Sequence, residues 1–192
     1  MTTLLLVRHG ETDWNRDGRW QGHSDTPLNE LGRRQARGLA AELDGVDVVY
    51  SSDLARARET AEIIAARLGV PVRLDARLRE RSFGAWEGLT TAEIEERFRE
   101  AHGRWQSGEG FGPDDAESFE TFDDRVRSFL DDVLHRHPQE TVLVIGHGGS
   151  IRVMQAVASG LDYVRDKRLI PSVANCAVAR YAARDGRLLP TD

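Results

Sequence analysis

The sequence predicts an α/β fold: a three-layer sandwich with a mostly parallel central sheet, helices on both faces and a small cap insertion. Short apolar runs typical of buried strands alternate along the chain with longer segments in which apolar residues recur every three or four positions. Three of these runs end abruptly in polar segments, two of which contain glycine. Functional residues of parallel sheets follow the carboxyl ends of strands, so this second pattern also favours a parallel sheet.

Length and composition indicate one domain spanning residues 1–192, with a sizeable core. The net charge of −6 argues against nucleic acid or an anionic membrane as a partner. No apolar run is long enough to cross a membrane, and Arg8 interrupts the first run too early for a signal peptide, so we expect a cytoplasmic protein. Cys176 is the only cysteine, which excludes an intrachain disulfide.

The first half of the chain contains three predicted strands. Residues 4–7 form a buried apolar run, and the loop over 10–29 that follows is long enough to indicate a function. Asn29 is a candidate N-cap for a helix that ends at Gly45. The remaining elements of this half are strands over 46–50 and 70–74, with a helix over 54–68 between them.

The second half begins with a glycine-containing loop over residues 79–89 and a helix opened by a capping-box pattern at Thr90 and Glu93. We expect the stretch from about 84 to 122 to form the cap over the carboxyl edge of the sheet. The later predicted elements are a helix over 119–133, a strand over 141–145, a helix over 151–161 and a closing strand over 172–181.

The three polar strand ends would converge at one edge of a parallel sheet. They are Arg8-His9-Gly10, Ser51-Ser52-Asp53 with Arg56 one turn later, and Gly146-His147-Gly148. Arginine forks and helix N-termini bind phosphate, and a neutral imidazole can attack phosphorus. A departing alcohol needs a proton donor, and Glu80, in a glycine-containing loop beside aromatic residues, is the best candidate. Surface histidines at strand ends are the structural alternative to this site.

These segments resemble the motifs of the histidine phosphatase superfamily, in its phosphoglycerate-mutase-like branch. The resemblance covers residues 4–150, and its motifs follow one another in the family's order. They are Leu6 to Asn15, Gln21-Gly22 with Asp25 and Leu28, Ser51 to Ala57, Leu78-Arg79-Glu80 with Gly84, Trp86-Glu87-Gly88, and Gly146 to Gly149.

The resemblance implies a role for each matching residue. His9 would be the phosphorylated nucleophile, and Glu80 would be the proton donor and later the base that activates water. The residues that would hold the phosphoryl group and stabilise its transition state are Arg8, Arg56 and His147. Further contacts to phosphate oxygens would come from Asn15, Gln21, Gly22 and the Gly148 amide. Such an enzyme needs neither a metal nor a cofactor.

The sequence favours a metal-independent phosphatase acting on a small phosphomonoester, such as a sugar phosphate or a phosphoglycerate-like metabolite. Mutases of the family carry a His-Tyr pair where this chain has Ser82-Phe83, and residues 92–117 lack the lysine and paired arginines that mutases have there. A cofactor-dependent phosphoglycerate mutase and a non-catalytic phosphometabolite-binding domain are the alternatives. The sequence leaves the oligomeric state open, a homodimer included. A metal hydrolase is disfavoured by the absence of an HExxH pattern.

Several other polar residues have weaker claims to the site. Arg81 is placed either against the distal part of the substrate or at the surface. Arg58 should face solvent, because it lies two helical positions from Arg56. His135 and His137 are expected at the surface near a helix end, and His23 is disfavoured as a residue of the pocket.

Overall fold

The computed structural model describes residues 1–110, 112–184 and 187–191, and a six-stranded sheet with the order β3-β2-β4-β1-β5-β6 lies at its centre. β1, β2, β3 and β4 pair in parallel, whereas β5 runs antiparallel to β1 and β6 runs antiparallel to β5. The mostly parallel sheet predicted from the sequence is therefore confirmed. The strands are β1 (Thr2–Arg8), β2 (Val48–Ser51), β3 (Val72–Leu74), β4 (Thr141–Gly146), β5 (Val178–Arg184) and β6 (Arg187–Pro190).

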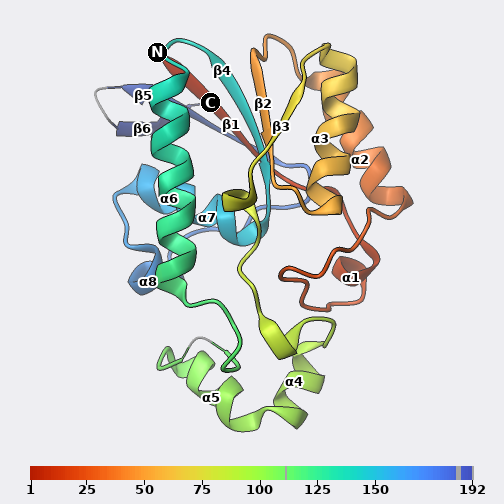
Figure 1. Ribbon diagram of the computed structural model, residues 1–192, viewed down its shortest axis with the longest axis vertical. Coiled ribbons are helices and arrows are strands. Elements are labelled where there is room, and N and C mark those ends of the chain that lie inside the picture. Colours follow the sequence, from red (N-terminus) through yellow and green to blue (C-terminus); the bar gives the residue numbers. More distant parts are fainter. Residues whose placement is uncertain (111, 185–186, 192) are drawn as a thin grey trace.

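Helices cover both faces of this sheet, α2 and α3 on one face and α6 and α7 on the other (Figure 1). The helices are α1 (Asp13–Arg16), α2 (Glu30–Glu42), α3 (Ala55–Leu68), α4 (Thr91–Arg97), α5 (Arg99–Ser107), α6 (Phe119–Arg136), α7 (Gly148–Ser159) and α8 (Tyr163–Asp166), with the 3-10 turns η1 (Ala76–Leu78) and η2 (Gly84–Trp86).

β1 shows why the central strands are apolar without alternation. Successive side chains of a strand point to opposite faces of the sheet. Leu4 and Leu6 pack with the cluster under α6 and α7, whereas Leu5 and Val7 pack with the cluster under α2 and α3. All four side chains are at most 1% exposed. A strand covered on both faces must be apolar at every position, and this requirement explains the continuous run in the sequence.

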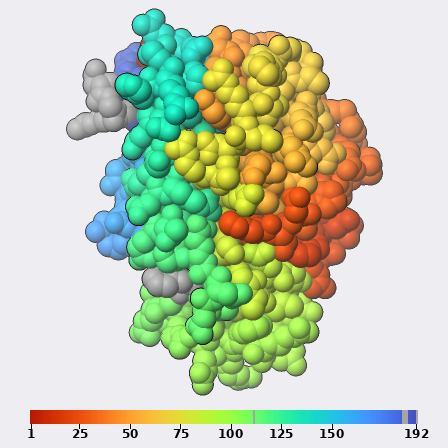
Figure 2. Space-filling view, in the orientation of Figure 1, coloured from red at the N-terminus to blue at the C-terminus, as the bar shows by residue number. Residues whose placement is uncertain are grey.

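The segment expected to form the cap carries η2, α4 and α5, which lie beyond the carboxyl ends of the parallel strands (Figure 1). Residue 111 of this segment lies outside the described residues. The loop after β1 is hydrogen-bonded to the cap segment. The Trp20 backbone amide donates to the Leu89 carbonyl at 3.0 Å, and the Trp20 carbonyl accepts from the Gly88 amide at 2.8 Å. In the space-filling view the red loop lies against the yellow-green segment (Figure 2).

The end of the chain differs from the prediction. The closing strand was expected over residues 172–181, but β5 begins at Val178 and continues to Arg184, and it is followed by β6, for which there was no prediction. Residues 172–177 instead form a loop in which Cys176 has a φ of 56° and donates its amide to the Arg8 carbonyl at 2.8 Å. This left-handed residue interrupts the extended conformation expected over 172–181, and the strand begins only after it.

His137 is also placed differently from the expectation. It is 5% exposed rather than at the surface, and its Nε2 lies 3.0 Å from the Tyr50 hydroxyl. Its Nδ1 lies 2.7 Å from the Glu140 carboxylate. The turn after α6 folds the ring against the sheet, where both ring nitrogens find partners. His135, two residues earlier, is exposed as expected. Among the described helices, none has the length and apolar character that crossing a membrane requires.

Candidate active site

His9 lies at the carboxyl end of β1 and is 3% exposed. Its Nδ1 is 2.7 Å from the Gly10 carbonyl oxygen. A carbonyl only accepts hydrogen bonds, so Nδ1 must carry the proton and the Nε2 lone pair is left available. Burial, followed by the positive charges of Arg56 and Arg8, holds the pKa of His9 well below its usual value. The imidazole is therefore neutral and nucleophilic at neutral pH.

His147 lies at the end of the neighbouring strand β4, with its ring centroid 5.1 Å from that of His9. Its Nε2 is 2.9 Å from the Ser52 hydroxyl, at the end of β2. Burial and the charge of Arg56 lower the pKa of His147 well below its usual value, so this ring is also neutral. The convergence of three strand ends predicted from the sequence is thus seen directly in this contact.

Arg56 is 1% exposed on the first turn of α3. It donates hydrogen bonds to the carbonyls of Ser24 and Gly22, both at 2.8 Å. Desolvation lowers the pKa of Arg56 to about 10, so it remains a cation at neutral pH. The loop after β1 therefore fixes the direction of a buried guanidinium. Arg8 is similarly anchored, because its Nη1 donates to the Val173 carbonyl at 3.0 Å.

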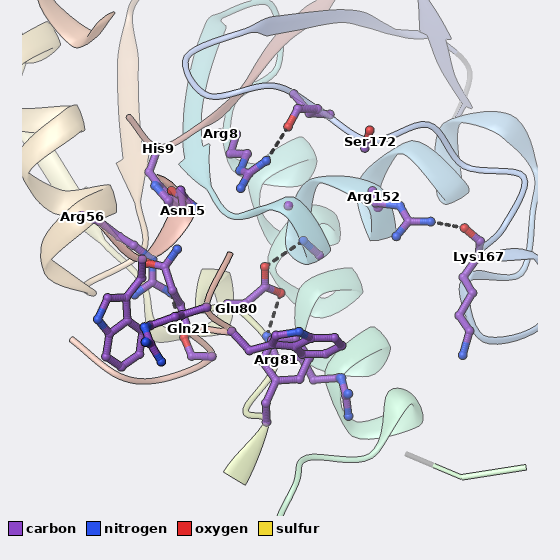
Figure 3. Close-up of a pocket in the computed structure, with 18 of the residues that line it drawn as sticks. Arg8, His9, Asn15, Gln21, Arg56, Glu80, Arg81, Arg152, Lys167 and Ser172 are labelled. Atoms are coloured by element: carbon purple, nitrogen blue, oxygen red, sulfur yellow. Dashed lines mark hydrogen bonds between the residues drawn. The ribbon is translucent and has the colours of Figure 1, made fainter. Parts of the chain in front are cut away.

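Glu80 follows η1, and its two carboxylate oxygens are held by backbone amides. One accepts from the amide of Arg81 at 2.9 Å, and the other accepts from the amide of Gly149 at 3.0 Å. Gly149 lies in the first turn of α7, so the carboxylate sits at the positive end of a helix. Figure 3 shows Glu80 pointing into the cavity between Arg8 and Arg81.

Asn15 and Gln21 are oriented by Thr12 and Thr26. The Asn15 carboxamide oxygen accepts from the Thr12 backbone amide at 3.2 Å, and the Gln21 oxygen accepts from the hydroxyls of Thr12 and Thr26 at 3.1 and 2.7 Å. With their oxygens engaged in this way, both residues have NH₂ groups to offer as donors to the cavity. This polarity suits an anionic ligand.

These side chains surround a cavity of about 450 Å³, a size suited to a small metabolite (Figure 3). Nine of the ten residues predicted for the site line it, and His147 is instead fully buried beside His9. Arg81, left undecided between substrate and surface, is 2% exposed and lines the cavity. The nine are Arg8, His9, Asn15, Gln21, Gly22, Arg56, Glu80, Arg81 and Gly148.

The weaker candidates lie elsewhere. Arg58 is exposed beside Glu62, with 3.9 Å between the charged atoms, and His23 does not line the cavity among the described residues. In the part of the chain that the structure describes, no group of three or more His, Cys, Asp or Glu side chains is arranged to hold a metal ion.

Sequence reasoning missed several residues around the cavity. The side-chain NH₂ group of Asn175 donates to the His9 carbonyl at 2.7 Å, and Tyr163, Arg152 and Lys167 line the wall beyond Glu80. Arg152 could have been found, because it lies four positions after Gly148 and therefore on the same face of the predicted helix. The other three come from loops or short turns near the chain end, where no periodicity marks them.

Comparisons with known proteins bear on the family and the fold of this chain. The family model of the histidine phosphatase superfamily (branch 1) matches residues 4–189. A bifunctional protein of Mycobacterium tuberculosis is 39% identical over 189 residues, which are 95% of this chain, but the chain spans only about half (51%) of that relative's length. Phosphoserine phosphatase 1 of Hydrogenobacter thermophilus is 38% identical over 165 residues, covering 84% of this chain and 78% of that protein.

Among solved structures, a mycobacterial glucosyl-3-phosphoglycerate phosphatase in complex with VO3 matches with a TM-score of 0.89 and 32% identity. The match covers 98% of this chain and 96% of the other. Fold, family model and named relatives together support the enzyme class expected from the sequence, a phosphoric monoester hydrolase. The chain belongs to branch 1 of the histidine phosphatase superfamily.

Proposed function

We propose that this protein hydrolyses small phosphomonoesters through a phosphohistidine intermediate at His9, without a metal ion. The observation that carries the proposal is the state of His9. It is a buried neutral ring whose Nδ1–H is held by the Gly10 carbonyl, so Nε2 is the nucleophilic nitrogen, and two guanidinium groups lie close enough to depress its pKa. A binding domain would need the arginines but not an oriented nucleophile beside a carboxyl group.

In the first chemical step, His9 Nε2 attacks phosphorus and the bond to the alcohol oxygen breaks. Arg8 and Arg56 stabilise the negative charge on the equatorial oxygens, and a proton from Glu80 neutralises the departing oxygen. The products are a free alcohol and a phosphorylated imidazole.

In the second step, the Glu80 carboxylate takes a proton from a water molecule whose oxygen attacks phosphorus. The bond from phosphorus to Nε2 then breaks, which restores neutral His9 and releases inorganic phosphate. One carboxyl group serves both steps because it is deprotonated by the first and reprotonated by the second.

Hydrolysis is favoured over phosphoryl transfer between two metabolites by the residues after Glu80. Phe83 lines the cavity where mutases of the family carry a hydroxyl-bearing aromatic residue. Its ring lies 4.7 Å from the Arg81 guanidinium carbon and packs edge-on against Trp20. It therefore presents no hydroxyl group to a second phosphorylated ligand. A cytoplasmic location and a homodimer stay predictions.

Phosphate release should be measured with para-nitrophenyl phosphate and with 3-phosphoglycerate, in excess chelator. We expect turnover of the aryl ester to be unchanged by the chelator and to be inhibited by vanadate, which mimics five-coordinate phosphorus. Activity lost in chelator and restored by added metal would contradict the proposal. So would rapid conversion of 3-phosphoglycerate to 2-phosphoglycerate in the presence of a bisphosphorylated primer.

A further inference from the structure

The tautomer of His9 depends on one peptide unit, the unit that joins Gly10 to Glu11. Its carbonyl, which belongs to Gly10, accepts from His9 Nδ1 at 2.7 Å. Its amide, which belongs to Glu11, donates to the side-chain oxygen of Gln35 at 2.9 Å. A trans peptide unit is planar, and its C=O and N–H groups point in opposite directions, so neither group turns without the other. The Gln35 side chain therefore fixes the direction of the carbonyl that faces His9.

Gln35 reaches this peptide unit from outside the cavity. It is a half-buried residue in the second turn of α2, which covers the same face of the sheet as α3 (Figure 1). Gln35 is not among the described residues that line the cavity, so a substrate held there does not contact it. Any effect of Gln35 on the reaction must pass through the peptide unit between Gly10 and Glu11.

The first turn of α2 leaves this peptide unit little room to move. A Cβ atom at Gly10 would lie 2.6 Å from the Gly32 carbonyl oxygen, and a Cβ atom at Gly32 would overlap the Glu11 carbonyl oxygen. Gly32 comes three positions before Gln35 and therefore lies on the same face of the helix. The two glycines thus allow the helix backbone to approach the peptide unit closely, which brings the Gln35 side chain within hydrogen-bonding distance.

The preceding peptide unit, between His9 and Gly10, is also held on both sides. The His9 carbonyl accepts from the Asn175 NH₂ group at 2.7 Å, and the Gly10 amide donates to the Thr60 hydroxyl oxygen at 3.0 Å. The Thr60 hydroxyl donates its own hydrogen to the Arg56 carbonyl at 2.7 Å, which leaves its lone pairs available to the Gly10 amide. With this unit fixed, the direction of the Gly10 carbonyl is set by the unit that follows.

The direction of that carbonyl matters because His9 is only 3% exposed. A neutral imidazole carries one proton, on either ring nitrogen. With the Gly10 carbonyl in place, a proton on Nδ1 has an acceptor, and Nε2 keeps the lone pair that attacks phosphorus. If the carbonyl turned away, a proton on Nδ1 would be buried without a partner, and the tautomer protonated on Nε2 would gain population. That tautomer has no lone pair on Nε2 for the attack.

We propose that Gln35 is a positioning residue for the phosphorylation of His9. By accepting from the Glu11 amide, it holds the Gly10 carbonyl against Nδ1 and keeps the neutral ring in its nucleophilic tautomer. The inference rests on the proposed function, in which His9 Nε2 attacks phosphorus. It gives a part in the reaction to α2, a helix that supplies none of the described residues of the cavity wall.

Two substitutions separate the hydrogen bond of Gln35 from the size of its side chain. Gln35→Met removes the acceptor at a similar length, whereas Gln35→Glu retains an acceptor oxygen. Both variants should fold, because the side chain is half-buried on the surface of a helix. We expect the single-turnover rate of His9 phosphorylation by para-nitrophenyl phosphate to fall about 3- to 10-fold in Gln35→Met, as for the loss of one hydrogen bond, and to change little in Gln35→Glu. The affinity for inorganic phosphate, measured as competitive inhibition, should be unchanged in both, because Arg8 and Arg56 keep their positions.

The tautomer itself is measured by nitrogen NMR of the protein labelled in its histidine rings, with the His9 signals identified by their absence in His9→Ala. In the parent protein we expect a protonated Nδ1 and an unprotonated Nε2 at neutral pH. In Gln35→Met, the shifts of the two nitrogens should move toward each other, as in a mixture of tautomers.

Leu39→Val is the matched control on the same helix. Leu39 lies one turn after Gln35 and is 6% exposed, so its truncation weakens the packing of α2 without removing the acceptor of the Glu11 amide. Urea unfolding should show lower stability in this variant. Its His9 shifts and its phosphorylation rate should equal those of the parent protein.

The outcomes separate this inference from the proposed function. Unchanged His9 shifts or an unchanged phosphorylation rate in Gln35→Met would overturn the inference, provided that the parent protein forms a phosphoenzyme. Equal effects in Leu39→Val or in Gln35→Glu would overturn it as well, because they would show a structural role without a specific hydrogen bond. A parent protein that forms no phosphoenzyme, with a tautomer that still changes in Gln35→Met, would overturn the proposed function while Gln35 still controlled the ring.

Discussion

The Glu80 carboxylate accepts a hydrogen bond from the Gly149 amide at 3.0 Å, so the candidate acid is held by the helix that begins beside His147. Gly149 approaches closely enough that a Cβ atom there would overlap Glu80 Oε1 and lie 3.0 Å from the Phe122 ring. One short segment after β4 therefore positions both His147 and the candidate acid.

Glu80→Gln tests the proton transfer. An alkyl alcohol leaves poorly as an alkoxide, whereas nitrophenolate leaves without a proton, so the loss should depend on the leaving group. We expect phosphorylation by an alkyl phosphate to slow by about 10²–10⁴-fold, with a much smaller effect for para-nitrophenyl phosphate. Single-turnover rates are needed, because the same carboxylate activates water in the second step. Equal losses on both substrates would assign Glu80 a structural role.

Gly149→Ala tests the position of Glu80 without changing its chemistry. The added methyl group must displace the carboxylate, so the variant should resemble Glu80→Gln in losing alkyl phosphate activity most. Gly148→Ala is the matched control, since its Cβ would lie 3.9 Å from Glu80 Oε2 in ordinary contact. Comparable leaving-group dependence in the two variants would argue against positioning by this contact.

Glu87→Gln tests how Arg56 is held. The Glu87 carboxylate accepts from the amides of His23, Ser24 and Phe83 at 2.9, 2.8 and 3.0 Å, and from the Ser24 hydroxyl at 2.6 Å. An amide NH₂ facing these donors leaves at least one unpaired, which costs about 1–3 kcal/mol of stability. Vanadate affinity should also fall, because the Ser24 carbonyl orients Arg56.

Urea unfolding measures that loss of stability, and a vanadate titration measures the effect on the site. The control is Glu62→Gln, which alters an exposed pair with Arg58 at 3.9 Å. Lower stability with unchanged vanadate affinity would show that the loop does not control Arg56.

Burial, Arg56 and Arg8 hold the pKa of His9 well below 6.5 in the folded protein. Below the unfolded value of about 6.5, the unfolded chain takes up a proton that folded His9 does not. The contribution of His9 to the free energy of unfolding is therefore fully present above the pKa of the unfolded chain, and it falls as the pH is lowered toward the pKa of folded His9. Lowering the pH from about 7.5 to about 5.5 removes about 1.4 kcal/mol of this contribution. Urea unfolding of His9→Gln should show a correspondingly smaller decrease, and an identical decrease would mean that folded His9 titrates normally.

Much of the fold could be predicted from the sequence, because the residue patterns that specify it are local. The run at 4–7, the strand end at His9 and the capping box at Thr90 each depend on neighbours within a few positions. In the structure, the Thr90 hydroxyl accepts from the Glu93 amide at 3.3 Å and the Glu93 carboxylate accepts from the Thr90 amide at 2.8 Å. The resemblance of the ordered motifs to a known family then narrowed the prediction from a phosphate-binding site to a histidine phosphatase.

What the sequence did not predict depends on contacts between distant segments. His137 was misplaced because its partner Tyr50 lies 87 positions away. Lys167 and Tyr163 line the cavity, but they come from the short helix α8 and the residue after it, which no periodicity marks. The left-handed conformation of Cys176, which delays the start of β5, has no signal in residue type.

The account depends most on His9 as the phosphorylated group, and rapid quenching with labelled phosphomonoester measures this directly. We expect an acid-labile, base-stable phosphoenzyme that forms before phosphate is released, with the label mapped to His9 and absent in His9→Ala. Phosphate released in a single turnover with no phosphoenzyme, or label on another residue, would contradict the central claim.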